Sequence, residues 1–246
     1  MSDSDLVLCK IDGPVAVVSF NRPEKHNAFN DAMDDEFFAL LADLHGNEDI
    51  RAMVLRGEGK SFSSGRDTTE LGVRAPGVTD LDFIAQGHAR TKLLWTAPFP
   101  ILVALKGWVI GGSFERALLC DMRIASEDTR MSLPEVAHGV IPDSGGVARL
   151  FQMAGHGLAA DMALTGRVMD AAEALSHGVV SRVVPAADLD DAVMEAACAI
   201  AARSPLAVRL AREVLRMLAT PEVERSMHQE WLSQTIVMGE RRQSDD

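Results

Sequence analysis

Apolar residues recur along this chain with two different periods, and the change from one period to the other marks its predicted elements. Residues 6–20 (LVLCKIDGPVAVVSF) contain two short apolar runs on either side of Asp12-Gly13. An Asp-Gly pair between two such runs favours a β-hairpin. Residues 30–47 then carry apolar side chains at helical spacing, with Asn30 or Asp31 available as the N-cap and Gly46 near the end. The sequence therefore predicts a hairpin followed by a helix.

The same reasoning extends over the rest of the chain. Strands are predicted at 51–57, 100–107, 122–126 and 179–184, with a further short strand before the Gly pair at 111–112. Helices are predicted at 80–96, 113–120, 145–153, 157–164 and 171–177. From Leu189 to Gly239 three amphipathic helices follow, separated at Ser204-Pro205 and Thr220-Pro221.

Strands and helices thus alternate over the first two-thirds of the chain, and the last fifth is helical. This order is typical of an α/β fold with a helical C-terminal region. We expect residues 1–188 to form the core with the active site, and residues 189–246 to form a helical region of the same fold unit. The alternation also suggests a recurring β-β-α unit, although no repeat is visible at the level of residues.

Composition and charge narrow the possible functions. Hydrophobic residues make up 47% and charged residues 24% of the 246 positions, as in ordinary globular proteins. No apolar run reaches the roughly 18 residues that span a bilayer, and the polar start has neither a basic region nor an Arg-rich pattern. We therefore expect a cytoplasmic protein that is not bound to membranes. The net charge of -12 argues against a nucleic-acid surface, and an anionic ligand would need local basic groups and backbone donors.

Three widely spaced cysteines add little to this picture. Cys9, Cys120 and Cys198 show no CxxC spacing, which argues against a disulfide framework or a zinc site. Each is expected to be a small buried hydrophobic residue in a reducing compartment.

Two glycine-containing loops are the first candidates for chemistry. "SFSSGRD" ends in Gly65-Arg66 after one predicted strand, and "VIGGSFE" carries Gly111-Gly112 between another strand and a helix. Strand-to-helix junctions point free N–H groups outward, so one amide from each loop could bind a single oxygen as an oxyanion hole. The alternative is that both loops are simply tight turns. Neither fits GxGxxG, so a dinucleotide site is not indicated.

Three acidic residues follow these loops: Glu115, Glu135 and Asp143. Glu115 could act in catalysis or could only favour the helix dipole from the first turn. Glu135 could equally be a solvated loop carboxylate, and Asp143 precedes Ser144 and a predicted helix as a good N-cap would. No set of residues has metal-ligand spacing, and no Gly-x-Ser-x-Gly elbow is present. His138 is expected to be a packed or surface residue.

Taken together, four segments in this order and spacing resemble the enoyl-CoA hydratase/isomerase, or crotonase, family over nearly the whole chain. The segments are FNRPEKHNAF (20–29), GEGKSFSSGRD (57–67), GWVIGGSFERALLCDMRIAS with MSLPEVAHGVIPDSGG (107–146), and SPLAVRLAREVL (204–215). The resemblance implies a spiral of β-β-α turns with a C-terminal helical trimerisation region, assembled as homotrimers or dimers of trimers. It also implies an acyl-CoA substrate and no permanently bound cofactor, with coenzyme A entering as part of the substrate.

The resemblance also implies roles for individual positions. Arg66 and Gly112 would supply the oxyanion amides, Glu115 and Glu135 would be the two hydratase glutamates, and Asp143 matches a position where some dienoyl-CoA isomerases carry a working Asp. The region that embraces coenzyme A would include Arg22, Glu24, Lys25, Ser64, Gly65, Asp67, Thr68 and Gly111.

The expected reaction is hydration of a trans-2-enoyl-CoA thioester, with Glu135 as the main acid/base and Glu115 positioning the water. Alternatives are a double-bond isomerase, which the additional Asp143 favours, and a non-catalytic acyl-CoA-binding relative, which two matched acids oppose. The family's hydratases usually carry small or apolar residues where Phe114 and Arg116 flank this Glu, and RRQSDD stands where the family usually continues into a covering helix. Residues 68–96 are expected to supply the acyl-pocket walls, with these candidates: Leu71, Phe83, Ile84 and Trp95. The alternative for these four is ordinary helix packing, which is the preferred interpretation for most of them.

Overall fold

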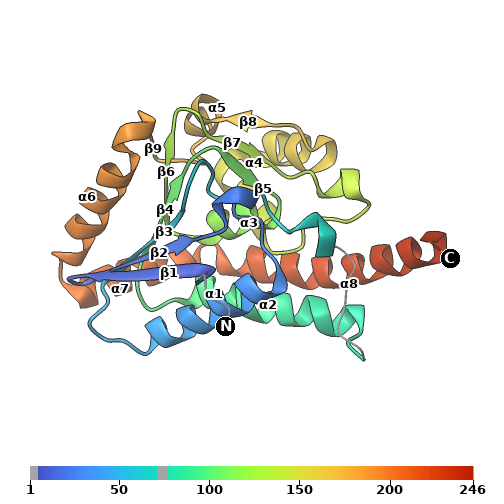
Figure 1. The fold of residues 1–246 in the computed structure, drawn as a ribbon, viewed down its shortest axis with the longest axis horizontal. Coiled ribbons are helices and arrows are strands. Elements are labelled where there is room, and N and C mark those ends of the chain that lie inside the picture. The colour runs from blue at the N-terminus through green and yellow to red at the C-terminus, as the bar shows by residue number, and fades with distance from the viewer. Residues whose placement is uncertain (1–4, 71–76, 246) are drawn as a thin grey trace.

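The protein is described by a computed structural model that covers residues 5–70 and 77–245. Its centre is a six-stranded sheet in the order β1-β2-β3-β4-β6-β9 (Figure 1). The strands are β1 (Val7–Asp12), β2 (Val15–Phe20), β3 (Ala52–Gly57), β4 (Ile101–Leu105), β6 (Met122–Ser126) and β9 (Arg182–Val184). β1 and β2 form the predicted hairpin, and all later pairs in this sheet are parallel.

A second, smaller sheet has the order β5-β7-β8 and contains β5 (Trp108–Ile110), β7 (Arg130–Ser132) and β8 (Met169–Asp170). The chain passes from the large sheet to the small sheet and then into a helix, twice in succession. The first turn is β4, β5 and α3 (Gly112–Leu119), and the second is β6, β7 and α4 (Gly146–Thr165). Because β4 pairs with β6 and β5 with β7, successive β-β-α units stack in parallel. The predicted spiral is thereby confirmed.

Helices cover both faces of the large sheet. The main core lies between one face and a group that includes α1 (Asp31–His45), α3 and α4. The other face packs against α6 (Leu189–Ala201), which Figure 1 shows at the outer side of the sheet. α8 (Thr220–Asp245) runs beside α2 (Asp80–Thr96) and also contacts α4. α7 (Pro205–Met217) and the short α5 (Ala171–Ser176) complete the described α-helices.

The two helices expected at 145–153 and 157–164 are confirmed: together they make up α4, which is interrupted at Gly155, whose φ of 79° and ψ of 173° are not helical. Two other details differ from the prediction. β7 and β8 were not predicted, because strands of three and two residues are too short to show an alternating pattern. The strand expected at 179–184 comprises only residues 182–184.

The prediction for the cysteines is wrong at two of the three positions. Cys120 is buried, but Cys9 and Cys198 are exposed. Cys9 lies on the edge strand β1, where only Val7 is buried, and Cys198 lies on a face of α6 that the sheet does not cover. Element positions at an edge or on an outer face decide their exposure, and the local sequence does not reveal this.

Candidate active site

Glu115 lies inside the protein, on the first turn of α3. The helix begins directly after Gly111, whose φ of 58° favours glycine, and Glu115 is only 1% exposed. Its carboxylate accepts three backbone N–H groups from one loop: Ser144 (3.0 Å), Gly146 (3.1 Å) and Asp143 (3.2 Å). A Cβ at Gly146 would lie 2.5 Å from the carbon atoms of Glu115, so a glycine is required where this loop meets the helix.

Glu135 reaches the same region from the short 3-10 helix η3 (Glu135–His138), which follows β7. A Cβ at Gly111 would lie 2.7 Å from Glu135 Oε1, so this carboxylate packs on the turn that starts α3. Its other oxygen, Oε2, is buried and has no hydrogen-bond partner within the described part of the chain. A buried acceptor without a partner is costly unless a ligand, water or proton satisfies it.

Burial raises the pKa of Glu135 to about 7, with a further contribution from the negative charge of Asp143. Burial also raises the pKa of Glu115 well above its ordinary value, and the charges of Glu135, Glu230 and Asp143 add to this effect. These are the signs of carboxylates that lie close together and compete for protons. The two glutamates singled out from the sequence therefore belong to one buried acidic cluster.

The alternative role of Asp143 as an N-cap is wrong. α4 begins at Gly146, its N-cap is Gly145, and no side chain of its own segment caps it. The N–H groups at this helix end are bound instead by Glu115 and Glu230, which come from other helices. Asp143 lies in the loop before them, where its charge acts on the neighbouring acids, and its carbonyl oxygen contacts Nε2 of His88.

The two glycine-containing loops lie against each other. Phe29 donates its N–H to the carbonyl of Gly65 (2.7 Å), and Ile110 donates to the carbonyl of Ser63 (3.1 Å). Gly65 has a φ of 88°, and a Cβ there would lie 2.7 Å from the carbonyl oxygen of Ile110. The side chains of Ser63 and Ser113 also bond to each other at 2.7 Å. The first loop is thus fixed to β5 immediately before the turn into α3.

The amides of Arg66 and Gly112 differ from those around them. The N–H of Gly65 is bound by the Ser63 hydroxyl, and that of Gly111 by the carbonyl of Ser132. Neither the Arg66 N–H nor the Gly112 N–H donates a hydrogen bond to another described residue. One unused donor is therefore available in each loop, which is what a two-amide oxygen site requires.

The residues expected to contact coenzyme A also lie together. Ser64 donates its N–H to the carbonyl of His26 (2.9 Å), which connects the segment around residues 22–28 with the loop at 64–68. Arg22 pairs with Asp67 (3.2 Å) and donates to the carbonyl of Ala28 (2.6 Å), so this guanidinium also holds the two segments together. The exposed members of the expected group are Glu24, Lys25 and Thr68.

The two large residues on either side of Glu115 are held in the core and against α1. Phe114 is fully buried in the core. Arg116 turns toward α1, where it pairs with Asp34 at 2.7 Å and lies over the rings of Phe29 and Phe38. Both side chains therefore serve packing and the attachment of α3.

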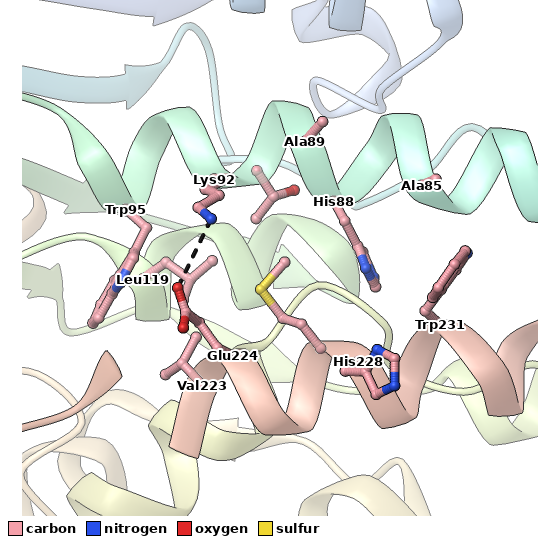
Figure 2. A pocket seen from close by; sticks show the side chains of 12 residues that line it. Ala85, His88, Ala89, Lys92, Trp95, Leu119, Val223, Glu224, His228 and Trp231 are labelled. Carbon is pink, nitrogen blue, oxygen red and sulfur yellow. Dashed lines mark ion pairs between the residues drawn. The ribbon is translucent and has the colours of Figure 1, made fainter. Parts of the chain in front are cut away.

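A pocket of about 420 Å³ opens between α2 and α8; the four clustered acids do not line it, but His88, which contacts the carbonyl of Asp143, does. Figure 2 shows side chains of both helices directed into it, among them His88, Trp95, His228 and Trp231. Lys92 and Glu224 pair across it at 3.8 Å. Among the expected acyl-pocket residues, Trp95 lines this space, Ile84 is buried and Phe83 is partly buried, whereas Leu71 lies outside the described residues.

Sequence reasoning missed two polar residues of α8, Glu230 and Gln234, which are 7% and 4% exposed. Glu230 accepts the N–H of Gly145 (2.9 Å), and Gln234 accepts that of Ile141 (3.0 Å). A signal was present in the sequence. Both residues continue the apolar spacing of Val223 and Met227, so they interrupt the side of the helix that packs inward.

Neither metal sites nor membrane spans are found in the described ranges. Within residues 5–70 and 77–245, no three His, Cys, Asp or Glu side chains gather as a metal site would require. No helix in these ranges combines the length and the apolar character needed to cross a bilayer.

Comparison with known proteins agrees with this geometry. The family model for enoyl-CoA hydratase/isomerase matches residues 10–243. A "Probable enoyl-CoA hydratase" of Mycobacterium bovis is 36% identical over 212 residues, which are 86% of this chain and 81% of the relative. The short-chain-enoyl-CoA hydratase of Clostridium acetobutylicum is 33% identical over 210 residues, with 85% and 80% covered.

Solved structures give the same result for the fold. An enoyl-CoA hydratase/isomerase from Pseudoalteromonas atlantica superimposes with a TM-score of 0.86 at 28% identity, over 95% of this chain and 91% of that one. The β-β-α spiral, the paired loops and the matching family model lead to one conclusion: this chain belongs to the enoyl-CoA hydratase/isomerase family.

Proposed function

We propose that this protein hydrates trans-2-enoyl-CoA thioesters. The observation that carries the proposal is the convergence of Glu115 and Glu135 in one buried cluster, next to the turn that contributes the unused amide of Gly112. Hydration needs these two components together: donors for the thioester oxygen and a pair of carboxyl groups for the water and the proton.

In this proposal the thioester oxygen accepts the N–H groups of Arg66 and Gly112. Negative charge develops on that oxygen as the carbonyl becomes an enolate, and two amide donors stabilise the charge. Removing one donor of an oxyanion hole typically costs about 3–4 kcal/mol of transition-state stabilisation. The rigid attachment of the first loop to β5 reduces the reorganisation needed during the reaction.

The carboxyl groups carry out the proton transfers. One carboxylate takes a proton from water as its oxygen bonds to the β carbon, and one carboxylic acid gives a proton to the α carbon. We assign the main acid/base role to Glu135, because its buried Oε2 has no protein partner and its pKa lies near 7. Glu115, held by three backbone N–H groups, positions the water.

The remaining parts of the substrate are assigned by position. The segments at 22–28 and 64–68 accept coenzyme A, which enters with the substrate, so the proposal needs no resident cofactor. The acyl group extends toward the pocket between α2 and α8, where apolar and ring side chains would contact it (Figure 2).

Turnover of enoyl-CoA thioesters in ¹⁸O-labelled water tests this function. The wild-type protein should incorporate one labelled oxygen into the product. Glu135→Gln should lower kcat by about 10²- to 10⁴-fold, the usual contribution of a general acid/base. Glu127→Gln, which changes an exposed acid on the turn after β6, is the matched control and should retain wild-type turnover. Equal turnover by the Glu135→Gln and wild-type proteins would refute the assignment.

A double-bond isomerase of the same family is the second candidate, and Asp143 favours it. The charge of Asp143 acts on Glu115, Glu135 and Glu230, so a third acid is coupled to the pair although hydration does not require it. An isomerase moves a proton between the α and γ carbons and consumes no water. Product formed without labelled oxygen, together with loss of turnover in Asp143→Asn, would support isomerisation over hydration.

Self-association through α7 completes the proposal. Leu206, Leu210, Val214 and Met217 follow helical spacing along α7 and are 50–70% exposed, and Arg212 is the one buried residue of that helix. A continuous exposed apolar face of this kind marks an interaction surface. We propose that copies of this chain cover it in a homotrimer or a dimer of trimers.

A further inference from the structure

The loop from Ile141 to Gly146 is held almost entirely by three side chains. Glu115 accepts the N–H groups of residues 143, 144 and 146. Gln234 accepts that of Ile141, and Glu230 accepts that of Gly145. The remaining residue, Pro142, has no N–H. Every amide in the loop is therefore bound by a side chain of α3 or α8.

α8 approaches this loop closely enough to require glycine. Gly145 has a φ of 80°, and a Cβ there would lie 2.9 Å from Cγ of Met227. Glu230 and Gln234 are four residues apart, so both project from the same side of α8. Both are less than 10% exposed, so their hydrogen bonds to the loop are shielded from water.

The surroundings of Glu230 connect it with the candidate catalytic acids. Glu115 and Asp143 face it from α3 and from the loop, and on its own helix Ser226 donates a hydroxyl hydrogen bond to its Oε1 at 2.5 Å. His88 of α2 contacts the loop through the carbonyl of Asp143. Burial raises the pKa of Glu230 to about 7, with a contribution from the charge of Asp143. Its own negative charge is one cause of the raised pKa of Glu115.

We propose that Glu230 is a positioning residue of the active site: from α8 it holds the loop that orients Glu115, and it places a further carboxyl group beside the acidic cluster. Gln234 supports the first of these roles. The inference rests on the proposed function, because it assigns Glu230 a task that matters only if Glu115 and Glu135 act on substrate.

Two substitutions of Glu230 separate the effect of its charge from the effect of its hydrogen bond to Gly145. Glu230→Gln keeps an oxygen that can accept the Gly145 N–H but removes the negative charge. Removing that charge lowers the pKa of Glu115, so the limb of the kcat/KM profile that reports Glu115 should move to lower pH, by about half a unit, with maximal kcat within about threefold of wild type. Glu230→Ala also removes the acceptor, so kcat should fall about tenfold while KM changes less.

Glu222→Gln is the matched control, because it removes an exposed acid from the same helix. Its pH profile should coincide with that of the wild type. Titration of ¹³C-labelled glutamate carboxyl groups provides a readout besides activity, since the signal of Glu115 should titrate at lower pH in Glu230→Gln. Because this variant retains the hydrogen bond, it remains informative if Glu230→Ala does not fold.

Two outcomes distinguish this inference from the proposed function. If Glu135→Gln is inactive but Glu230→Gln has the wild-type pH profile and an unchanged Glu115 titration, the positioning role is wrong and the proposed function stands. If Glu135→Gln retains full activity, the proposed function is wrong. A downward pH shift in Glu230→Gln, with rescue of the Glu230→Ala defect in kcat by Gln, would support the positioning role.

Discussion

Glycine is needed at positions 111 and 146 because acidic side chains lie directly beside both. A side chain at Gly111 would meet the Oε1 atom of Glu135, and one at Gly146 would meet Glu115. Both glycines therefore provide the space in which the two carboxyl groups can approach the turn at the start of α3. Glycine at position 111 also tolerates the φ of 58° that this turn requires.

Substitution of Gly111 tests the space that Glu135 needs. Gly111→Ala places a methyl group where Glu135 Oε1 lies, so we expect kcat to fall by about 10²-fold because catalytic groups lose rate when displaced by about 1 Å. Steady-state kinetics would measure this.

Gly13→Ala is the control for backbone strain. Gly13 has a nearly identical φ of 56°, but a Cβ there meets nothing within 4 Å. We expect this variant to lose stability while its kcat is unchanged. Equal kcat in the Gly111→Ala and wild-type proteins would show that Glu135 does not depend on this space.

The raised pKa of Glu135 predicts how stability depends on pH. Its carboxyl group titrates near 7 in the folded protein, against an ordinary value of 4.5. Between these values the folded chain holds a proton that the unfolded chain has released, so this contribution is full below about pH 4.5 and is lost as the pH rises through 7. Each pKa unit corresponds to about 1.4 kcal/mol.

Thermal unfolding at a series of pH values between 5 and 8 would check this dependence. Glu135→Gln should show a shallower loss of Tm with rising pH than the wild type, since the substituted amide does not titrate. Glu127→Gln should keep the wild-type slope, because that side chain is exposed. Parallel curves for all three proteins would contradict the assignment of a raised pKa to Glu135.

Among the elements, α3 is attached to α1 through an ion pair as well as through the core. Arg116 bonds to both carboxylate oxygens of Asp34, at 2.7 and 3.1 Å, and the two side chains are 16% and 12% exposed. The guanidinium also lies 4.5 Å from the ring centroid of Phe29. Because α3 carries Glu115, this attachment supports the site without contacting it.

Removing the guanidinium of Arg116 should lower the free energy of unfolding, while kcat should change less. Arg116→Met leaves the mostly buried Asp34 without its partner, so we expect the free energy of unfolding to fall by about 3 kcal/mol. Urea denaturation would measure the change. Arg56→Met is the comparison, because Arg56 forms more exposed pairs with Glu58 and Asp190 and should lose less than about 1 kcal/mol. Equal losses in both variants would show that burial does not distinguish the pairs.

For the protein as a whole, the exposed apolar face of α7 predicts that the protein is an oligomer in solution. Leu210→Glu combined with Val214→Glu introduces charges into the proposed interface, where burying them would be costly. Sedimentation should shift from an oligomer toward the 26.5 kDa single chain. Leu164→Glu changes a leucine of α4 that is 73% exposed and lies outside α7, so it should leave the oligomer intact. A monomeric wild-type protein would refute the proposed association.

The amino-acid pattern was sufficient for much of this architecture. The hairpin at Asp12-Gly13, the cap at Asn30 and the three C-terminal helices follow from turn chemistry, capping and helical spacing, which are local properties. The glycine-containing loops and Glu115 and Glu135 were also identifiable, because their spacing resembles that of a known family. β7 and β8 were missed because strands of two or three residues leave no periodic signal.

The way the acidic side chains come together in the candidate active site depends on contacts between segments that lie far apart in the sequence. Glu230 is separated from Gly145 by 85 positions, and no local pattern indicates which loop its carboxylate will bind. The same applies to Asp143, which has the sequence of a helix cap but whose helix end is capped by acids from α3 and α8. Local sequence specifies elements because backbone geometry and periodicity are local, whereas burial, the raised pKa values of the acids and caps from other helices arise only once the helices have packed together.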